Sequence, residues 1–214
     1  MDRETTHPSV LVIACGALAG ELLMLVRRNH WEHVRVTCLP ARLHNRPEHI
    51  PQAVRDSIHA HRAAYRRIFV AYGDCGTGGE LDRVLAEEDV ERIPGAHCYE
   101  FLSGAQAFAR LADEEPASFY LTDFLARHFD SLVIRGLGLD RYPELRSLYF
   151  GNYRKMVYLS QRRDDDLIAR AQAAADRLGL SLDIRHTGLE PLAQVVTLAP
   201  GSEAVGKNNH SVLA

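Results

Sequence analysis

The segment SVLVIACGALAGELLMLV (residues 9–26) decides the fold. It opens with a continuous apolar run, which is typical of a buried strand in a parallel sheet. Cys15 and Gly16 end the run, and apolar residues then recur at the spacing of one helix face. That face is made of Leu18, Leu22, Leu25 and Val26. Gly and Glu interrupt the stretch, so it is not an uninterrupted membrane span. The segment predicts a strand, a tight turn and a helix.

The same alternation continues along the chain. Further strands are predicted at residues 34–39, 67–72, 90–93, 155–159 and 181–185, and helices at residues 17–28, 47–65, 80–88 and 164–178. Residues 101–148 are expected to be mostly helical, and residues up to 198 to form a last helix or strand. The βαβαβαβ order implies parallel strands joined by right-handed crossovers.

We therefore expect an α/β fold in one domain, residues 9–198. Its central, mostly parallel sheet would be flanked by helices in a Rossmann-like arrangement, with the site at the C-terminal ends of the strands. Residues 1–8 and 199–214 are polar or small, and we expect a flexible N-terminus and a disordered tail.

Composition excludes some classes of function. The net charge of −3 comes without a basic block, so nucleic acid is not an expected partner. The polar N-terminus does not have the pattern of a signal peptide, and no membrane association is expected. Four cysteines without a secretion signal favour a reducing cytoplasm, where cysteines at turns more often bind metal or do chemistry than form disulfides.

Three cysteines lie just past predicted strands, in short turns that contain glycine: Cys15, Cys75 and Cys98. Because ligands bind at the C-terminal ends of parallel strands, we expect the three thiols to meet. Thiolates bind zinc, and three protein ligands leave the open position of a catalytic zinc site. The candidates for a fourth ligand are His44, His97 and Cys38. The alternative is that these cysteines are small apolar core residues.

The loop GDCGTGG (residues 73–79) follows the third predicted strand. Such a loop can aim backbone N–H groups at an anion or turn tightly around a metal, although it lacks the lysine of a triphosphate-binding loop. We expect it to face a cofactor or a metal, through Gly76, Thr77, Gly78 and Gly79. A plain tight turn is the alternative. Asp74 and His97 are the candidate catalytic residues.

Polar and aromatic residues also gather in the second half of the chain. Tyr120 and Asp123 precede a predicted helix, and Asn152 and Arg154 precede a predicted strand. These residue types suit recognition of a small polar substrate. Asp123 is alternatively a helix cap.

Seven motifs occur in order between Val10 and Val196. They are ACGAL (14–18), LPARLHNRPE (39–48), YGDCGTGG (72–79), HCYEF (97–101), FYLTDFLARHFD (119–130), GLGLDRYPEL (136–145) and YFGNYRKMVYLSQ (149–161). Together they resemble the DUF1638 family of bacterial and archaeal proteins. Genes of that family often lie beside genes of corrinoid proteins and methyltransferases, so the resemblance implies a role in corrinoid-linked one-carbon metabolism.

Corrinoid methyl transfer commonly uses zinc held by thiolates and imidazole to activate a methyl acceptor. The resemblance therefore implies an enzyme with zinc bound by Cys15, Cys75 and Cys98, with His44 or His97 completing or supporting the site. No Asp-x-His-x-x-Gly cobalamin motif is present, so we expect any corrinoid to be held by a partner protein. A homo-oligomer is left open.

Two alternatives stand beside the zinc enzyme. The first is metal-free acid–base catalysis by two cysteines on opposite faces of a substrate, as in α/β amino-acid racemases. The second is a non-catalytic accessory factor that delivers a metal or a corrinoid to a methyltransferase.

Overall fold

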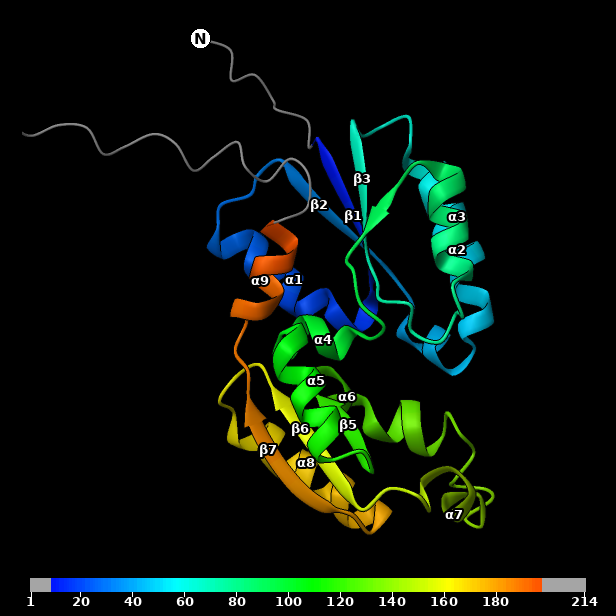
Figure 1. Cartoon of the computed structure of the whole chain (residues 1–214), viewed down its shortest axis with the longest axis vertical. Coiled ribbons are helices and arrows are strands. Elements are labelled where there is room, and N and C mark those ends of the chain that lie inside the picture. The colour runs from blue at the N-terminus through cyan, green and yellow to red at the C-terminus, as the bar shows by residue number, and fades with distance from the viewer. Residues whose placement is uncertain (1–8, 198–214) are drawn as a thin grey trace, which may run out of the picture.

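The strands form two parallel sheets, which lie one above the other in Figure 1. The structure is a computed structural model and describes residues 9–197. The first sheet has the order β2-β1-β3-β4 and the second the order β5-β6-β7. The strands of the first sheet are β1 (Val10–Cys15), β2 (Val34–Leu39), β3 (Arg67–Ala71) and β4 (Glu91–Arg92). Those of the second are β5 (Ser118–Thr122), β6 (Lys155–Ser160) and β7 (Ser181–His186).

Helices cover both faces of the first sheet. The elements of this half are η1 (Gly16–Leu18), α1 (Ala19–Arg28), η2 (Ala41–Asn45), η3 (Pro47–His49), α2 (Ile50–His61) and α3 (Glu80–Glu88). Leu11 and Ile13 of β1 pack toward α2 and α3, and Val12 and Ala14 pack toward α1. This alternation follows from the two-residue period of a strand. Burying each large aliphatic side chain contributes about 1.5–3 kcal/mol.

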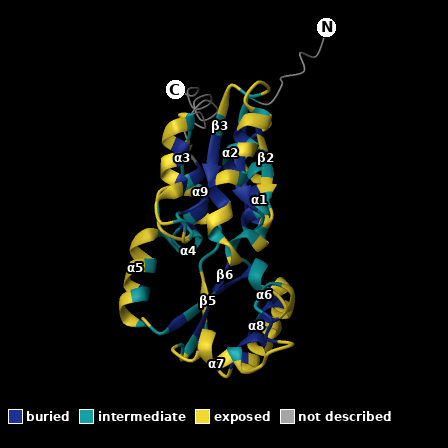
Figure 2. Cartoon of the chain, turned by 90° about the vertical axis from the view of Figure 1, so that its right-hand side faces the viewer, coloured by how far each residue is buried: buried dark blue, intermediate teal, exposed yellow. Residues whose placement is uncertain are grey.

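The second sheet is covered mainly by α6 and α8. The remaining elements are α4 (Cys98–Ser103), α5 (Ala105–Glu114), α6 (Asp123–Phe129), the π-helical turn η4 (Asp130–Ile134), α7 (Leu145–Phe150), α8 (Asp165–Leu178) and α9 (Glu190–Thr197). The Asp164 carboxylate accepts backbone hydrogen bonds at the start of α8, and Gly179 ends the helix in the left-handed conformation. The strands β3 and β6 are dark blue in Figure 2, at the buried centres of their sheets.

The chain returns to the first half at its end. Leu192 and Val196 of α9 pack with Leu22 and Leu25 of α1, and Figure 1 shows the two helices side by side. The polypeptide therefore crosses between the halves twice, after α5 and after β7. No helix within residues 9–197 is long and apolar enough to cross a membrane.

The predicted α/β class with parallel strands and flanking helices is confirmed. The strands are divided between two sheets, whereas one central sheet was expected. Residues 101–148 are mostly helical, as expected, but they also contain β5, which pairs with β6 and was not predicted. Its five residues are a short run among longer helical patterns, and its pairing with a strand more than thirty residues away leaves no local signal. The predictions for residues 1–8 and 199–214 lie outside the described residues.

A buried carboxylate joins β5 to β6. The Asp123 side chain is fully buried, and its Oδ1 accepts hydrogen bonds from the Tyr158 hydroxyl at 2.8 Å and the Gln161 N–H at 3.1 Å. The Arg162 Nε lies 3.5 Å from its other oxygen. Thr122, not Asp123, caps α6, because its Oγ1 accepts the Leu125 N–H.

Replacing Asp123 with Ala is expected to lower the free energy of unfolding by about 3 kcal/mol, because two buried donors lose their acceptor. Urea denaturation measures this change. The control is Asp165→Ala, at an exposed position in the first turn of α8, which should cost less than about 1 kcal/mol. Equal losses in the two variants would contradict a structural role for Asp123.

Candidate thiol and imidazole site

The site lies where the strand order of the first sheet reverses. β1 and β3 are adjacent at its centre, with β2 beyond one and β4 beyond the other. Open α/β sheets bind ligands outside the C-terminal ends of the strands at such a switch point. Cys15 ends β1, and Cys75 follows β3 by four residues. The topology therefore places these two thiols at the strand ends, where they were predicted.

Backbone contacts hold the loop after β3 against the loop after β4. The N–H of Asp74 donates to the carbonyl of Gly95 at 3.1 Å, and the N–H of Cys75 donates to that of Ala96 at 2.8 Å. Gly73 makes this approach feasible: a Cβ there would lie 3.1 Å from the His97 nitrogen and 3.2 Å from the Ala96 carbonyl. The two hydrogen bonds bring the loop of Cys75 beside the start of α4, where Cys98 is the first residue.

A third loop covers Cys15. Gly16 lets η2 approach β1, because a Cβ at Gly16 would lie 3.0 Å from the Leu39 carbonyl oxygen. The His44 Nδ1 consequently lies 3.6 Å from the Cys15 Sγ. The His44 ring also stacks on Tyr72, with ring centroids 6.4 Å apart and planes inclined by 17°.

Burial keeps these groups neutral. It raises the pKa of Cys15 to about 12, and the Ala17 N–H, 3.3 Å from the sulfur, offsets only part of that effect. Burial also raises the pKa of Cys75 and of Cys98, and the charges of Cys75 and Cys15 raise the pKa of Cys98 further. For His44, burial lowers the pKa. Charge on Cys75 raises the pKa of both Cys15 and Cys98, so the three thiols lie within electrostatic range of one another.

The donors do not yet form a metal site. Within the described residues, no three His, Cys, Asp or Glu side chains are grouped so that they hold a metal ion as they stand. Metal binding would require rotation of thiols toward one another.

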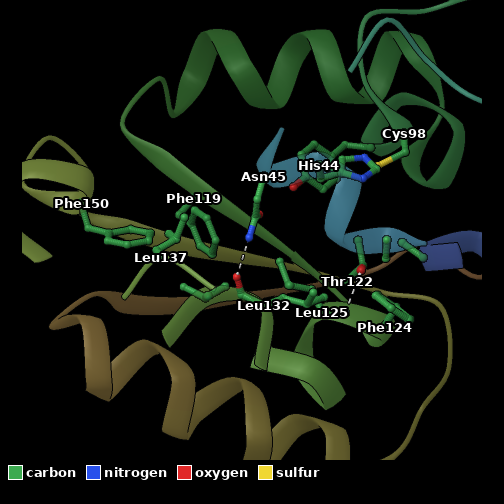
Figure 3. A pocket seen from close by; sticks show the side chains of 14 residues that line it. His44, Asn45, Cys98, Phe119, Thr122, Phe124, Leu125, Leu132, Leu137 and Phe150 are labelled. Atoms are coloured by element: carbon green, nitrogen blue, oxygen red, sulfur yellow. Dashed lines mark hydrogen bonds between the residues drawn. The ribbon is translucent and has the colours of Figure 1, made fainter. Parts of the chain in front are cut away.

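A mainly apolar pocket of about 300 Å³ is lined by Cys98, and side chains of β5 and α6 form part of its wall. His44 and Cys98 lie at one end of it in Figure 3, and Phe119, Leu137 and Phe150 at the other. The Asn45 Nδ2 donates to the Leu132 carbonyl at 3.2 Å and so links η2 to η4 across the pocket. The remaining lining residues are Ala17, Ala41, Tyr99, Thr122, Phe124, Leu125 and Val133.

The glycine-rich loop is organised by its own carboxylate. Asp74 accepts hydrogen bonds from the Thr77 hydroxyl at 2.6 Å, the Gly79 N–H at 2.9 Å and the Gly78 N–H at 3.2 Å. These bonds lower the pKa of Asp74, which makes it a weak base. Two of the N–H groups predicted to face a cofactor are thus already engaged. Gly76 and Thr77 face a surface groove beside α2, away from the thiol pocket.

His97 and Cys38 lie outside the pocket lining. His97 is exposed at the N-cap of α4, with its ring beside Tyr99 and Phe108. Its backbone N–H donates to the Glu100 carboxylate, an arrangement that explains the residue as part of a helix start. Cys38 is exposed on β2. Of the three candidates for a fourth ligand, His44 is the one that lies beside Cys15.

The four residues expected to bind substrate are not gathered in the pocket. Tyr120 packs with Tyr99 and Phe108 beside it, with a buried hydroxyl. Asp123 is committed to the β5–β6 junction described above. Asn152 and Arg154 are exposed just before β6, at the opposite end of that strand from Ser160 and Gln161.

Sequence reasoning missed the apolar wall of the pocket. Phe119, Phe124, Leu132, Leu137 and Phe150 come from β5 and the segments around η4 and α7. The π-helical turn η4 marks this region as a candidate site, because such turns are frequent at functional sites. They have no short sequence pattern, so the turn could be found only in the structure.

Comparison with known families gives one match. The family described as "Protein of unknown function (DUF1638)" matches residues 38–196. Comparison with curated proteins and with solved structures finds no match.

Replacing Gly73 with Ala is expected to separate the loops that carry Cys75 and Cys98, because the added Cβ would lie 3.1–3.2 Å from backbone atoms of Ala96 and His97, which would have to shift. Alkylation of both thiols by iodoacetamide, followed by mass spectrometry, should become several-fold faster. The control is Gly20→Ala in α1, where a Cβ has nothing within 4 Å. Unchanged alkylation rates in Gly73→Ala would show that the contact does not shield the thiols.

Proposed function

This chain belongs to the DUF1638 family, and on that premise we propose that it binds zinc through Cys15, Cys75 and Cys98 and acts in corrinoid-linked methyl transfer. The observation that carries the proposal is that the segments after β1, β3 and β4 bring three thiols within electrostatic range of one another, with the His44 imidazole 3.6 Å from the Cys15 sulfur and Cys98 in the pocket wall.

The electrostatics of the site favour a bound cation. Cys15 is buried and Cys75 and Cys98 are half-buried, and charge on Cys75 would raise the pKa of both other thiols. Backbone N–H groups, the Tyr72 side chain near Cys15 and Arg92 near Cys75 offset part of this. A cation bound among the three sulfurs would stabilise all three thiolates together, and a coordinated thiol is deprotonated outright. The donor set therefore fits zinc chemically.

The roles follow from position. Cys15, Cys75 and Cys98 would hold the metal, and Cys98 also faces the pocket. When bound, zinc would supply a Lewis acid with one open position for a methyl acceptor. His44 would support Cys15 through the contact between its ring nitrogen and the sulfur. Burial lowers the pKa of His44, which favours a neutral imidazole at this end of the pocket.

The positions of the cysteines favour this function over metal-free catalysis by two thiols. Acid–base catalysis on opposite faces of a substrate needs a thiol on each side of the pocket. All four cysteines precede residue 99, and the wall contributed by β5, α6 and η4 is aromatic and aliphatic. A thiol with a pKa near 12 is also a poor base at neutral pH.

Zinc added to the metal-free chain is expected to bind in a 1:1 ratio and to release about three protons near pH 7.5, because the raised pKa values keep the thiols protonated before binding. Isothermal titration in buffers of different ionisation enthalpy counts the protons, and mass spectrometry counts the metal. Cys15→Ser, Cys75→Ser and Cys98→Ser should each lower the affinity by at least about 100-fold.

The matched control is Cys38→Ser, which removes an exposed thiol outside the pocket and should leave zinc binding unchanged. His44→Ala should weaken binding by about 10–100-fold without changing the metal-to-protein ratio. Full zinc affinity in all three cysteine variants would overturn the metal site.

Catalysis is tested separately with methylcobalamin and benzyl mercaptan. The zinc-loaded chain should accelerate methylation of the thiol, followed by the visible spectrum of the corrinoid, and Cys98→Ser should remove the acceleration. Zinc bound as predicted but without any acceleration, also with the corrinoid presented on a carrier protein, would instead favour the accessory role.

A further inference from the structure

We infer that the pocket between the two sheets takes a neutral ligand with an apolar, ring-sized body, and that it excludes carboxylates and phosphates. This names the substrate class of the proposed site and rests on the proposed function for the chemistry at the thiol end. It differs from the small polar substrate expected from the sequence.

The first argument is the absence of charge in the wall. Fourteen residues line the pocket in Figure 3, and none of them is Asp, Glu, Lys or Arg. The ionisable side chains among them are His44, Cys98 and Tyr99. A carboxylate brought into the pocket of the metal-free chain would therefore lose its hydration without gaining a Lys or Arg partner in the wall.

The second argument is that two of the polar side chains in the wall already take part in hydrogen bonds within the wall itself. The Thr122 hydroxyl oxygen accepts the Leu125 N–H at the start of α6. The Asn45 Nδ2 donates to the Leu132 carbonyl. These hydrogen bonds hold the wall together. They leave few polar groups in the wall to replace the hydrogen bonds to water that a strongly hydrated ligand would lose on binding.

The third argument is size and shape. The volume of about 300 Å³ is at the lower end of the range for small-molecule sites. An apolar cavity of about 150 Å³ already holds benzene. At the apolar end, the rings of Phe119 and Phe150 stand nearly perpendicular, at 80° and 5.3 Å between centroids. A perpendicular pair offers both a ring face and a ring edge to an aromatic or branched aliphatic group.

The two ends of the pocket then fix the orientation of the ligand. Figure 3 places Phe119, Leu137 and Phe150 opposite His44 and Cys98. The apolar body would occupy the first end, and the reacting atom of the ligand would lie beside the Cys98 thiol.

The test compares two probes of similar size and different charge, 4-fluoroanisole and 4-fluorobenzoate, by ¹⁹F NMR titration of the metal-free chain in chelator. Leu137→Trp fills the apolar end of the pocket. Ala41→Leu narrows the pocket from the side of η2. Leu148→Trp is the matched control, because Leu148 is 73% exposed on α7 and outside the pocket. Circular dichroism checks that each variant is folded.

We expect saturable binding of 4-fluoroanisole, at least about tenfold tighter than that of 4-fluorobenzoate. Binding should be lost in at least one folded pocket variant and kept in Leu148→Trp. Equal or tighter binding of the benzoate, no saturable binding of the anisole, or binding unchanged in both pocket variants would overturn the inference. Because no metal is present, these outcomes are independent of whether the zinc site exists.

Discussion

The site depends on two backbone hydrogen bonds between loops. The N–H groups of Asp74 and Cys75 donate to the carbonyls of Gly95 and Ala96, and the glycine at position 73 eases that approach, since a Cβ there would lie 3.1 Å from the His97 nitrogen. Without these bonds, the segments after β3 and β4 would be separate surface turns. With them, the loop of Cys75 lies beside the first residue of α4, and the Asp74 carboxylate closes the rest of the loop on itself. A backbone constraint thus positions the reactive side chains.

The two sheets contribute different properties to the pocket. The first sheet supplies sulfur and imidazole at its switch point, and the second supplies an uncharged wall of phenylalanines and aliphatic side chains. In such surroundings desolvation raises the pKa of the thiols, so they stay protonated near neutral pH. The same environment that opposes free thiolates favours a bound soft cation and an uncharged ligand. Metal preference and ligand preference therefore have one physical origin.

Local patterns predicted what is local. The apolar run before Cys15 gave β1, and Asp164 with Gly179 gave both ends of α8. The position of Cys15 and Cys75 after predicted strands placed both at the C-terminal edge of the first sheet, because parallel topology fixes which strand ends share an edge. The strands β6 and β7 were also predicted, but β5, the separation into a second sheet and the pocket wall were beyond such patterns, since β5 is defined by its pairing with β6. Asn152 and Arg154 were expected at the site from residue type alone, yet they precede β6 and so lie at its other end.

X-ray absorption spectroscopy of the zinc-loaded chain would test the central claim most directly, because it reads the atoms bound to the metal. We predict a first shell with three sulfur atoms at about 2.3 Å and one lighter atom. In Cys98→Ser the sulfur count should fall to two, and in Cys38→Ser it should stay at three. A shell of nitrogen and oxygen alone, or with a single sulfur, would contradict a metal site built from Cys15, Cys75 and Cys98.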